Sequence, residues 1–165
     1  MGWFSRKPKS DPTEVMRGLR EQALTVGPAD LSLSPALARP HVWGVLMETG
    51  YETAAASLVA FADGTTSLYF SNGGGVIGAG EHAAVRQASE GLLSAAESDV
   101  GTFVPVSDTT LPAIGRVRFL VRTFNGTVGA EAAEADLAGG AHPLSGVFFA
   151  AHRVITAIRE TTPAK

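Results

Sequence analysis

Hydrophobic residues recur with two different periods along this chain, and the changes of period divide it into helices and strands. In three segments apolar residues stand three and four positions apart, the period of one helix face. These segments are 12–26, 81–97 and 143–160. Elsewhere apolar residues recur at about every second position, which predicts strands.

The ends of the first helix are well marked. Asp11 is a favourable N-cap, Pro12 suits the first helical position, and Glu14 stands at capping-box spacing. A Gly-Pro pair at 27–28 ends the helix. The three prolines within 28–40 predict an extended connection that adds a candidate edge strand.

Six segments have the composition and alternation of strands. They are His41–Tyr51, Ser57–Ala62, Thr66–Ser71, Phe103–Val106, Arg116–Phe124 and Thr127–Ala132. Asp63-Gly64 and Asn125-Gly126 are strong signals for tight hairpins, so the strands that they join should be antiparallel neighbours.

The element order is helix, three strands, helix, two or three strands, helix. It predicts an α+β fold with a mostly antiparallel sheet of five to six strands, covered by about three helices. We expect a single domain over residues 11–160, with tails at 1–10 and 161–165. This order resembles the profilin-like and roadblock-like arrangement, and a fold alone implies no function.

Three sequence segments carry a second resemblance. They read SLYFSNGGGVIGAGEH, GRVRFLVRTFNG and HPLSGVFFAAHRVI. They resemble an uncharacterised family of small bacterial cytoplasmic proteins. That family has no assigned activity, so the resemblance implies no residue roles.

Composition narrows the class of protein. The chain has 165 residues, 45% of them hydrophobic and 18% charged, and a net charge of −3, which is small for this length. We expect a soluble domain that binds no nucleic acid. The first residues lack the apolar run of a secretory signal peptide, and no apolar run has the length of a membrane span. There are no cysteines, which excludes thiol chemistry and suits a reducing compartment, so we expect a cytoplasmic protein.

A glycine-rich loop is the sharpest candidate site. Its residues are Gly73, Gly74, Gly75, Gly78 and Gly80, followed by His82 at a helix start. The loop formally matches G-x-G-x-x-G, but the preceding strand belongs to a hairpin, whereas a dinucleotide site needs a parallel strand there. Two interpretations stay open: an anion or small-ligand site at the helix N-terminus, or glycines needed only for turns and close packing.

No other pattern indicates chemistry. The four histidines have no metal-ligand spacing, no serine stands on a nucleophile elbow, and no two carboxylates are singled out. Three arginines, at 116, 118 and 122, share one strand face, for which we expect solvent exposure and pairing with Glu131 or Glu134. We predict no catalytic residues, metal or cofactor.

The leading hypothesis is therefore a non-catalytic interaction or assembly domain. Its partner would be another protein or a second copy of the chain, bound through a helix or a sheet edge. The alternative is a small-ligand or anion-binding protein, with enzymatic activity left open, that uses loop 73–80.

Overall fold

A seven-stranded antiparallel sheet forms the centre of the protein. The computed structural model describes residues 11–35 and 41–162, with strand order β4-β3-β2-β1-β6-β7-β5. The strands are β1 (Val42–Gly50), β2 (Ala55–Phe61), β3 (Thr66–Phe70), β4 (Gly75–Val76), β5 (Val104–Pro105), β6 (Arg116–Thr123) and β7 (Gly126–Ala133). The α-helices are α1 (Pro12–Thr25), α2 (Ala83–Ser98), α3 (Glu134–Ala138) and α4 (Ser145–Thr161), with short 3-10 helices η1 (Pro28–Leu31), η2 (Ala79–Glu81) and η3 (Val100–Thr102). The predicted α+β class is confirmed.

The sheet has slightly more strands than predicted. The additional strand is β4, within the predicted glycine-rich loop, where Val76 pairs with Leu68 and Gly75 pairs with Tyr69 of β3. Gly75 has φ +147°, a conformation that favours glycine and lets the chain return along β3. A strand of two residues is too short to produce a period in the sequence.

The prediction for residues 28–40 is wrong over its described part. Residues 28–31 form the 3-10 helix η1 instead of an extended segment. The Asp30 carboxylate accepts a hydrogen bond from the Gly27 amide at 2.9 Å, which stabilises this turn locally. Residues 36–40, the rest of that prediction, lie outside the described residues.

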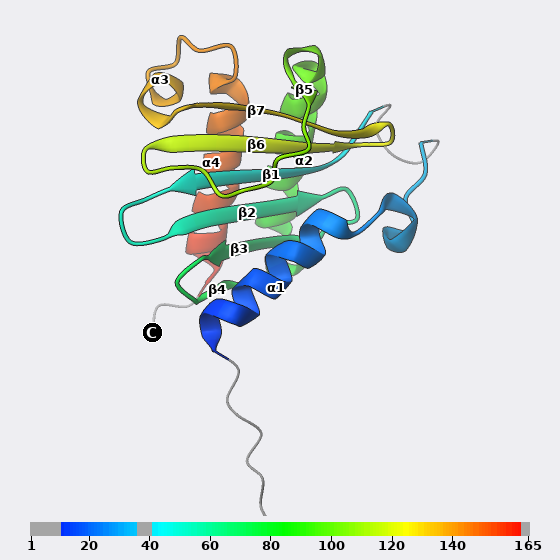
Figure 1. Cartoon of the computed structure of the whole chain (residues 1–165). Coiled ribbons are helices and arrows are strands. Elements are labelled where there is room, and N and C mark those ends of the chain that lie inside the picture. The colour runs from blue at the N-terminus through cyan, green and yellow to red at the C-terminus, as the bar shows by residue number, and fades with distance from the viewer. Residues whose placement is uncertain (1–10, 36–40, 163–165) are drawn as a thin grey trace, which may run out of the picture.

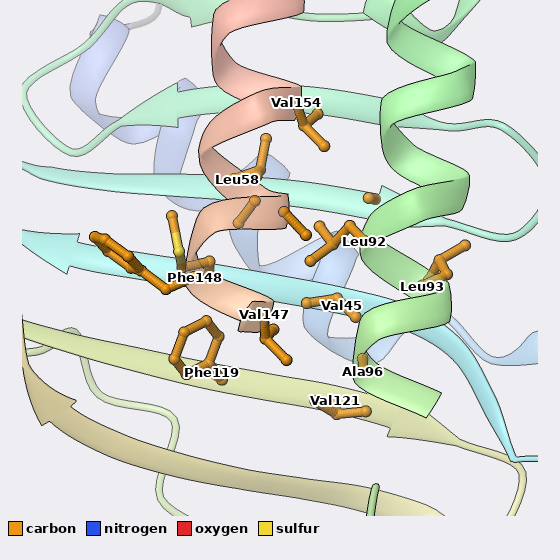
Figure 2. Packing of buried hydrophobic residues seen from close by; sticks show 14 of the residues in the cluster. Val45, Leu58, Leu92, Leu93, Ala96, Phe119, Val121, Val147, Phe148 and Val154 are labelled. Carbon is orange, nitrogen blue, oxygen red and sulfur yellow. The ribbon is translucent and has the colours of Figure 1, made fainter. Parts of the chain in front are cut away.

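Helices cover both faces of the sheet (Figure 1). Helices α2 and α4 pack together on one face, and α1 crosses the other face diagonally. Figure 2 shows the core between α2, α4 and the sheet, where Val45, Phe119 and Val121 meet Leu92 and Val147. The alternation predicted for β6 is confirmed, since Leu120 points to the opposite core beneath α1.

The α1 face is covered less completely than the α2/α4 face. Within α1 only Ala23 is buried, and Met16 and Leu19 are partly buried against the sheet. The sheet side of this core is made of large residues: Trp43, Leu46, Val59, Phe61, Tyr69 and Leu120. Apolar contacts alone therefore attach α1 weakly, and polar contacts have to contribute.

His152 lies at the margin of the larger core, on α4. Its Nε2 is buried and has no hydrogen-bond partner among the described residues. Its ring meets the Phe148 ring edge-on, with centroids 4.4 Å apart. Burial lowers the pKa of His152, which Glu134 raises to a smaller extent and Arg159 lowers further.

We expect the free energy of unfolding to fall as the pH drops below about 6.5, the ordinary histidine pKa. The pKa of His152 is lower in the folded state, so the unfolded chain binds the proton first and acid favours unfolding. Urea unfolding between about pH 5 and 7 measures this slope. His152→Phe should flatten it, and a slope unchanged from that of the unmodified protein would contradict the assignment.

Candidate functional site

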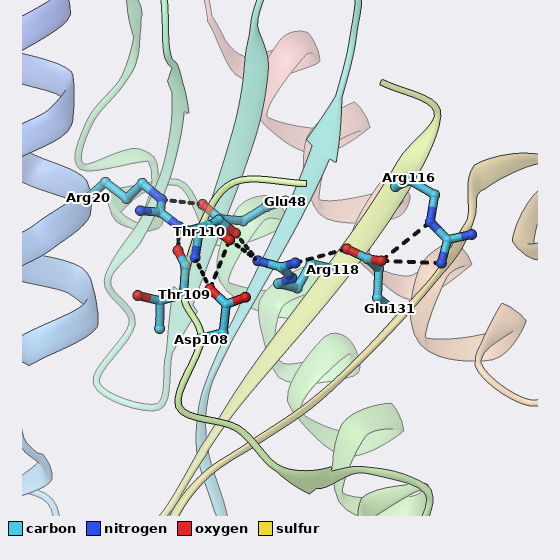
Figure 3. Close-up of polar contacts among 8 residues, drawn as sticks. All are labelled: Arg20, Glu48, Asp108, Thr109, Thr110, Arg116, Arg118 and Glu131. Atoms are coloured by element: carbon cyan, nitrogen blue, oxygen red, sulfur yellow. Dashed lines mark hydrogen bonds and ion pairs between the residues drawn. The ribbon is translucent and has the colours of Figure 1, made fainter. Parts of the chain in front are cut away.

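Glu48 is the buried charge at the centre of the α1 face. It lies on β1 with its side chain fully buried, and Arg20 of α1 binds it with two hydrogen bonds, Nε–Oε2 at 2.6 Å and Nη2–Oε1 at 2.7 Å (Figure 3). The Ser57 hydroxyl donates to the same carboxylate, and Arg20 also donates to the Thr109 carbonyl. The hydrogen bond with Glu48 raises the pKa of Arg20 against the opposing effect of burial. This pair holds α1 to the sheet.

The polar contacts continue along the neighbouring strands (Figure 3). Glu131 on β7 accepts from Arg118 at 3.0 Å and from Arg116 at 3.2 Å, which confirms the predicted pairing of these two arginines. Arg118 also donates to the carbonyl and hydroxyl of Thr110. Hydrogen bonds from the Thr110 amide and hydroxyl lower the pKa of Asp108. The loop before β6 is thereby attached to the same network.

The prediction that all three arginines face solvent is wrong for Arg122, and it holds for Arg116, at 40% exposed, better than for Arg118, at 17%. Its guanidinium lies beneath the end of α1 and donates to the carbonyls of Ala23 and Val26, each at 2.8 Å. It also lies 4.6 Å above the centroid of the Trp43 ring. The last carbonyls of a helix lack partners within the helix and attract a cation. Burial lowers the pKa of Arg122.

Two hollows flank α1 on its two sides. We call the first the Arg17 pocket; its volume is about 360 Å³. Its lining includes Met16 and Arg17 of α1, Ser57 of β2, Tyr69 and Phe70 of β3, and Leu111 of the loop before β6. The second, the loop groove, measures about 620 Å³ and is lined among others by Leu19, Val26, Phe61, Tyr69, Ile77 and Gly80. Tyr69 lies beneath α1 and lines both hollows.

The predicted site residues do not all meet at one place. Gly78 and Gly80 line the loop groove. Gly73 and Gly75 serve close packing: an added Cβ would lie 2.8 Å from the Pro12 Cβ at Gly73 and 2.2 Å from the Leu68 carbonyl oxygen at Gly75. Gly74, at φ +92°, has open space around it.

The helix that follows the loop begins at Ala83, with His82 as its N-cap. The His82 side chain makes no capping hydrogen bond and lies 3.8 Å from the exposed Glu81 carboxylate. Arg86 donates to the carbonyls of Gly80 and Glu81, at 3.0 and 2.8 Å, and so holds the turn. Ligand binding by this loop stays a prediction.

The other histidines have structural contacts. His41 Nδ1 lies 3.0 Å from Glu97, and His142 Nδ1 accepts from the Leu144 amide at the start of α4, as a cap should. Among the described residues, no three His, Asp or Glu side chains are arranged to hold a metal ion. No described helix has both the length and the apolar character that crossing a bilayer requires.

Comparison with family models, curated proteins and solved structures finds no match to this chain. Both resemblances described above therefore stay predictions, and the geometry of the α1 face carries the functional argument.

Sequence reasoning missed Arg20, Glu48 and Tyr69. One signal for Glu48 was present, because a single glutamate interrupts the apolar run of the longest predicted strand, HVWGVLMETGY. An unpaired carboxylate is rarely buried, so its position called for a cation from another element. The identity of the cation that pairs with Glu48 depends on where α1 crosses the sheet.

Proposed function

We propose that this protein is a non-catalytic interaction domain whose loop groove binds a short segment of a partner protein that is both apolar and basic. The observation that carries this proposal is the apolar surface in the groove. Val59, Phe61 and Tyr69 belong to the lining, each 8% exposed or less, and Ile77 supplies most of the accessible apolar surface, with 59% of its own surface exposed. Covering such a surface with apolar side chains stabilises a complex.

The charge of the groove favours a basic partner. Asp63 and Glu81 belong to its lining, as does one cation, Arg86. The Arg86 guanidinium is engaged by the carbonyls of Gly80 and Glu81. A lysine or arginine of the bound segment would therefore meet two carboxylates, and charge complementarity of this kind accelerates association and selects partners.

The polar network on the same face supports a binding role over catalysis. Arg20 and Glu48 are paired with each other, and Arg116 and Arg118 are paired with Glu131. These groups hold α1 and the strands in place, and their pairing leaves them poorly placed to transfer protons to a substrate.

We further propose that the protein acts in the bacterial cytoplasm. The absence of cysteine from the sequence supports a reducing compartment. The resemblance of the three sequence segments to a family of small bacterial proteins supports a bacterial source. If the partner is a second copy of this chain, the following experiment identifies it as such.

Site-specific photo-crosslinking tests the groove. Because the chain contains no cysteine, Ile77→Cys and Arg153→Cys each give one site for a benzophenone label. Arg153 is an exposed residue of α4 and serves as the matched control. We expect a crosslink in a bacterial lysate from position 77 and none from position 153, mapping to an apolar segment that contains lysine or arginine.

A synthetic peptide of the mapped segment then decides the proposal. It should bind the purified protein, with affinity that falls as salt rises, and Ile77→Asp should abolish binding. Equal crosslinking from both positions, a segment without basic residues, or no crosslink at all would overturn the proposal. A crosslink to the chain itself would identify the partner as a second copy, provided that the mapped segment has the stated chemistry.

A further inference from the structure

The Arg17 pocket lies on the opposite side of α1 from the loop groove, and we propose that it binds a small carboxylate with an apolar body. Its volume of about 360 Å³ is in the range of small-ligand sites. This proposal concerns a different hollow and a different class of ligand from the proposed partner segment, so each can fail without the other.

The Tyr69 hydroxyl is the first observation that points to a ligand. Tyr69 is 8% exposed and lines the pocket, and its hydroxyl has no hydrogen-bond partner among the described residues. The hydroxyl is not one of the described buried atoms that lack a partner, so solvent reaches it, and an acceptor atom placed in the pocket can take its hydrogen bond without displacing a described partner.

The surrounding polar groups are mainly donors. Arg17 is exposed and makes no ion pair or hydrogen bond within the described part of the chain. Arg20 uses Nε and Nη2 for Glu48 and Thr109, so its Nη1 has no described partner. Glu48 already balances the charge of Arg20, so Arg17 supplies the positive charge for a ligand. The Nη1 of Arg20 and the phenol hydroxyl add donors that suit a carboxylate, which offers acceptors only.

The rest of the lining selects for an apolar body. Met16, Phe70 and Leu111 form part of the wall, and Leu111 is 38% exposed. Glu21 is the acidic residue of this lining and opposes a bound anion. Glu21 therefore allows a test of whether the ligand is an anion. Removing the charge of Glu21 should strengthen binding of the carboxylate, whereas removing the charge of Arg17 should weaken it.

The experiment is a titration of the isotope-labelled protein with hexanoate, followed through the backbone amide resonances. Hexanamide, which has the same shape and no charge, is the control ligand. We expect hexanoate to shift the resonances of Arg17, Tyr69 and Leu111, and hexanamide to bind much more weakly. Arg17→Gln should weaken hexanoate binding about tenfold, or about 1.4 kcal/mol.

Three further variants separate this site from unspecific binding. Glu21→Gln should bind hexanoate more tightly, and Tyr69→Phe more weakly with its amide spectrum otherwise retained. Arg153→Gln, on the exposed side of α4, should bind as the unmodified protein does. Absence of shifts at the pocket, equal binding of the two ligands, or unchanged affinity in Arg17→Gln and Tyr69→Phe would overturn the proposal.

Discussion

Arg20→Ala is expected to lower the free energy of unfolding by about 3 kcal/mol. The substitution leaves the fully buried Glu48 carboxylate with the Ser57 hydroxyl as its described hydrogen-bond donor. Breaking a buried ion pair by removing one partner costs several kcal/mol, because the remaining charge stays out of water. The Arg20 side chain is 17% exposed, which places the effect at the lower end of that range.

Urea unfolding measures this loss of stability, and two further variants show whether it comes from the unpaired Glu48 charge. Arg17→Ala removes an exposed arginine of the same helix and should change stability by less than about 0.5 kcal/mol. The double variant Arg20→Ala/Glu48→Leu should recover much of the loss, because no unpaired charge remains buried. If Arg20→Ala were no more destabilising than Arg17→Ala, the pair would not hold α1 to the sheet.

Gly80→Ala is expected to cost about 3 kcal/mol. A Cβ at this position would lie 1.8 Å from the carbonyl oxygen of Gly64, in the turn between β2 and β3. That atom belongs to the backbone, so it cannot move aside by a change of rotamer. The loop or the hairpin has to shift, and both border the loop groove.

Alanine substitutions at two other glycines serve as references for the loss of stability in Gly80→Ala. Gly78→Ala meets no neighbouring atom but has φ +71°, so it should cost about 1 kcal/mol from backbone strain alone. Gly91→Ala, on the exposed side of α2 with open space around it, should stabilise the protein by up to about 1 kcal/mol. Thermal unfolding ranks the three variants, and equal losses at positions 78 and 80 would contradict the close approach to Gly64.

These contacts also determine how the glycine-rich loop can be tested. An alanine in place of Gly75 or Gly80 would collide with the backbone. A loss of binding in either variant could therefore result from a distorted fold as well as from the loss of a ligand contact. Ile77 projects at the groove margin and is largely exposed, so its substitution changes the surface of the loop without such a collision. For this reason the crosslinking experiment uses position 77.

Local signals in the sequence determined most of the elements. Asp11 caps α1 by accepting from the Thr13 amide, and the Asp-Gly and Asn-Gly pairs join antiparallel strands. The apolar stripe of the last helix is buried as predicted, from Val147 to Ile158. Such features depend on neighbours within a few residues, and periodicity and turn chemistry report those neighbours directly.

The tertiary structure alone decided where the candidate sites lie. Arg20 meets Glu48 across 28 positions, and Arg122 reaches the end of α1 across 96 to 99 positions. No local pattern specifies on which face α1 packs, or the line along which it crosses β2 and β3. That line pairs the buried charges, puts Arg122 beneath the last carbonyls of the helix, and leaves a hollow on each side of Tyr69. Both proposed binding sites exist because one weakly apolar helix covers that face of the sheet only in part.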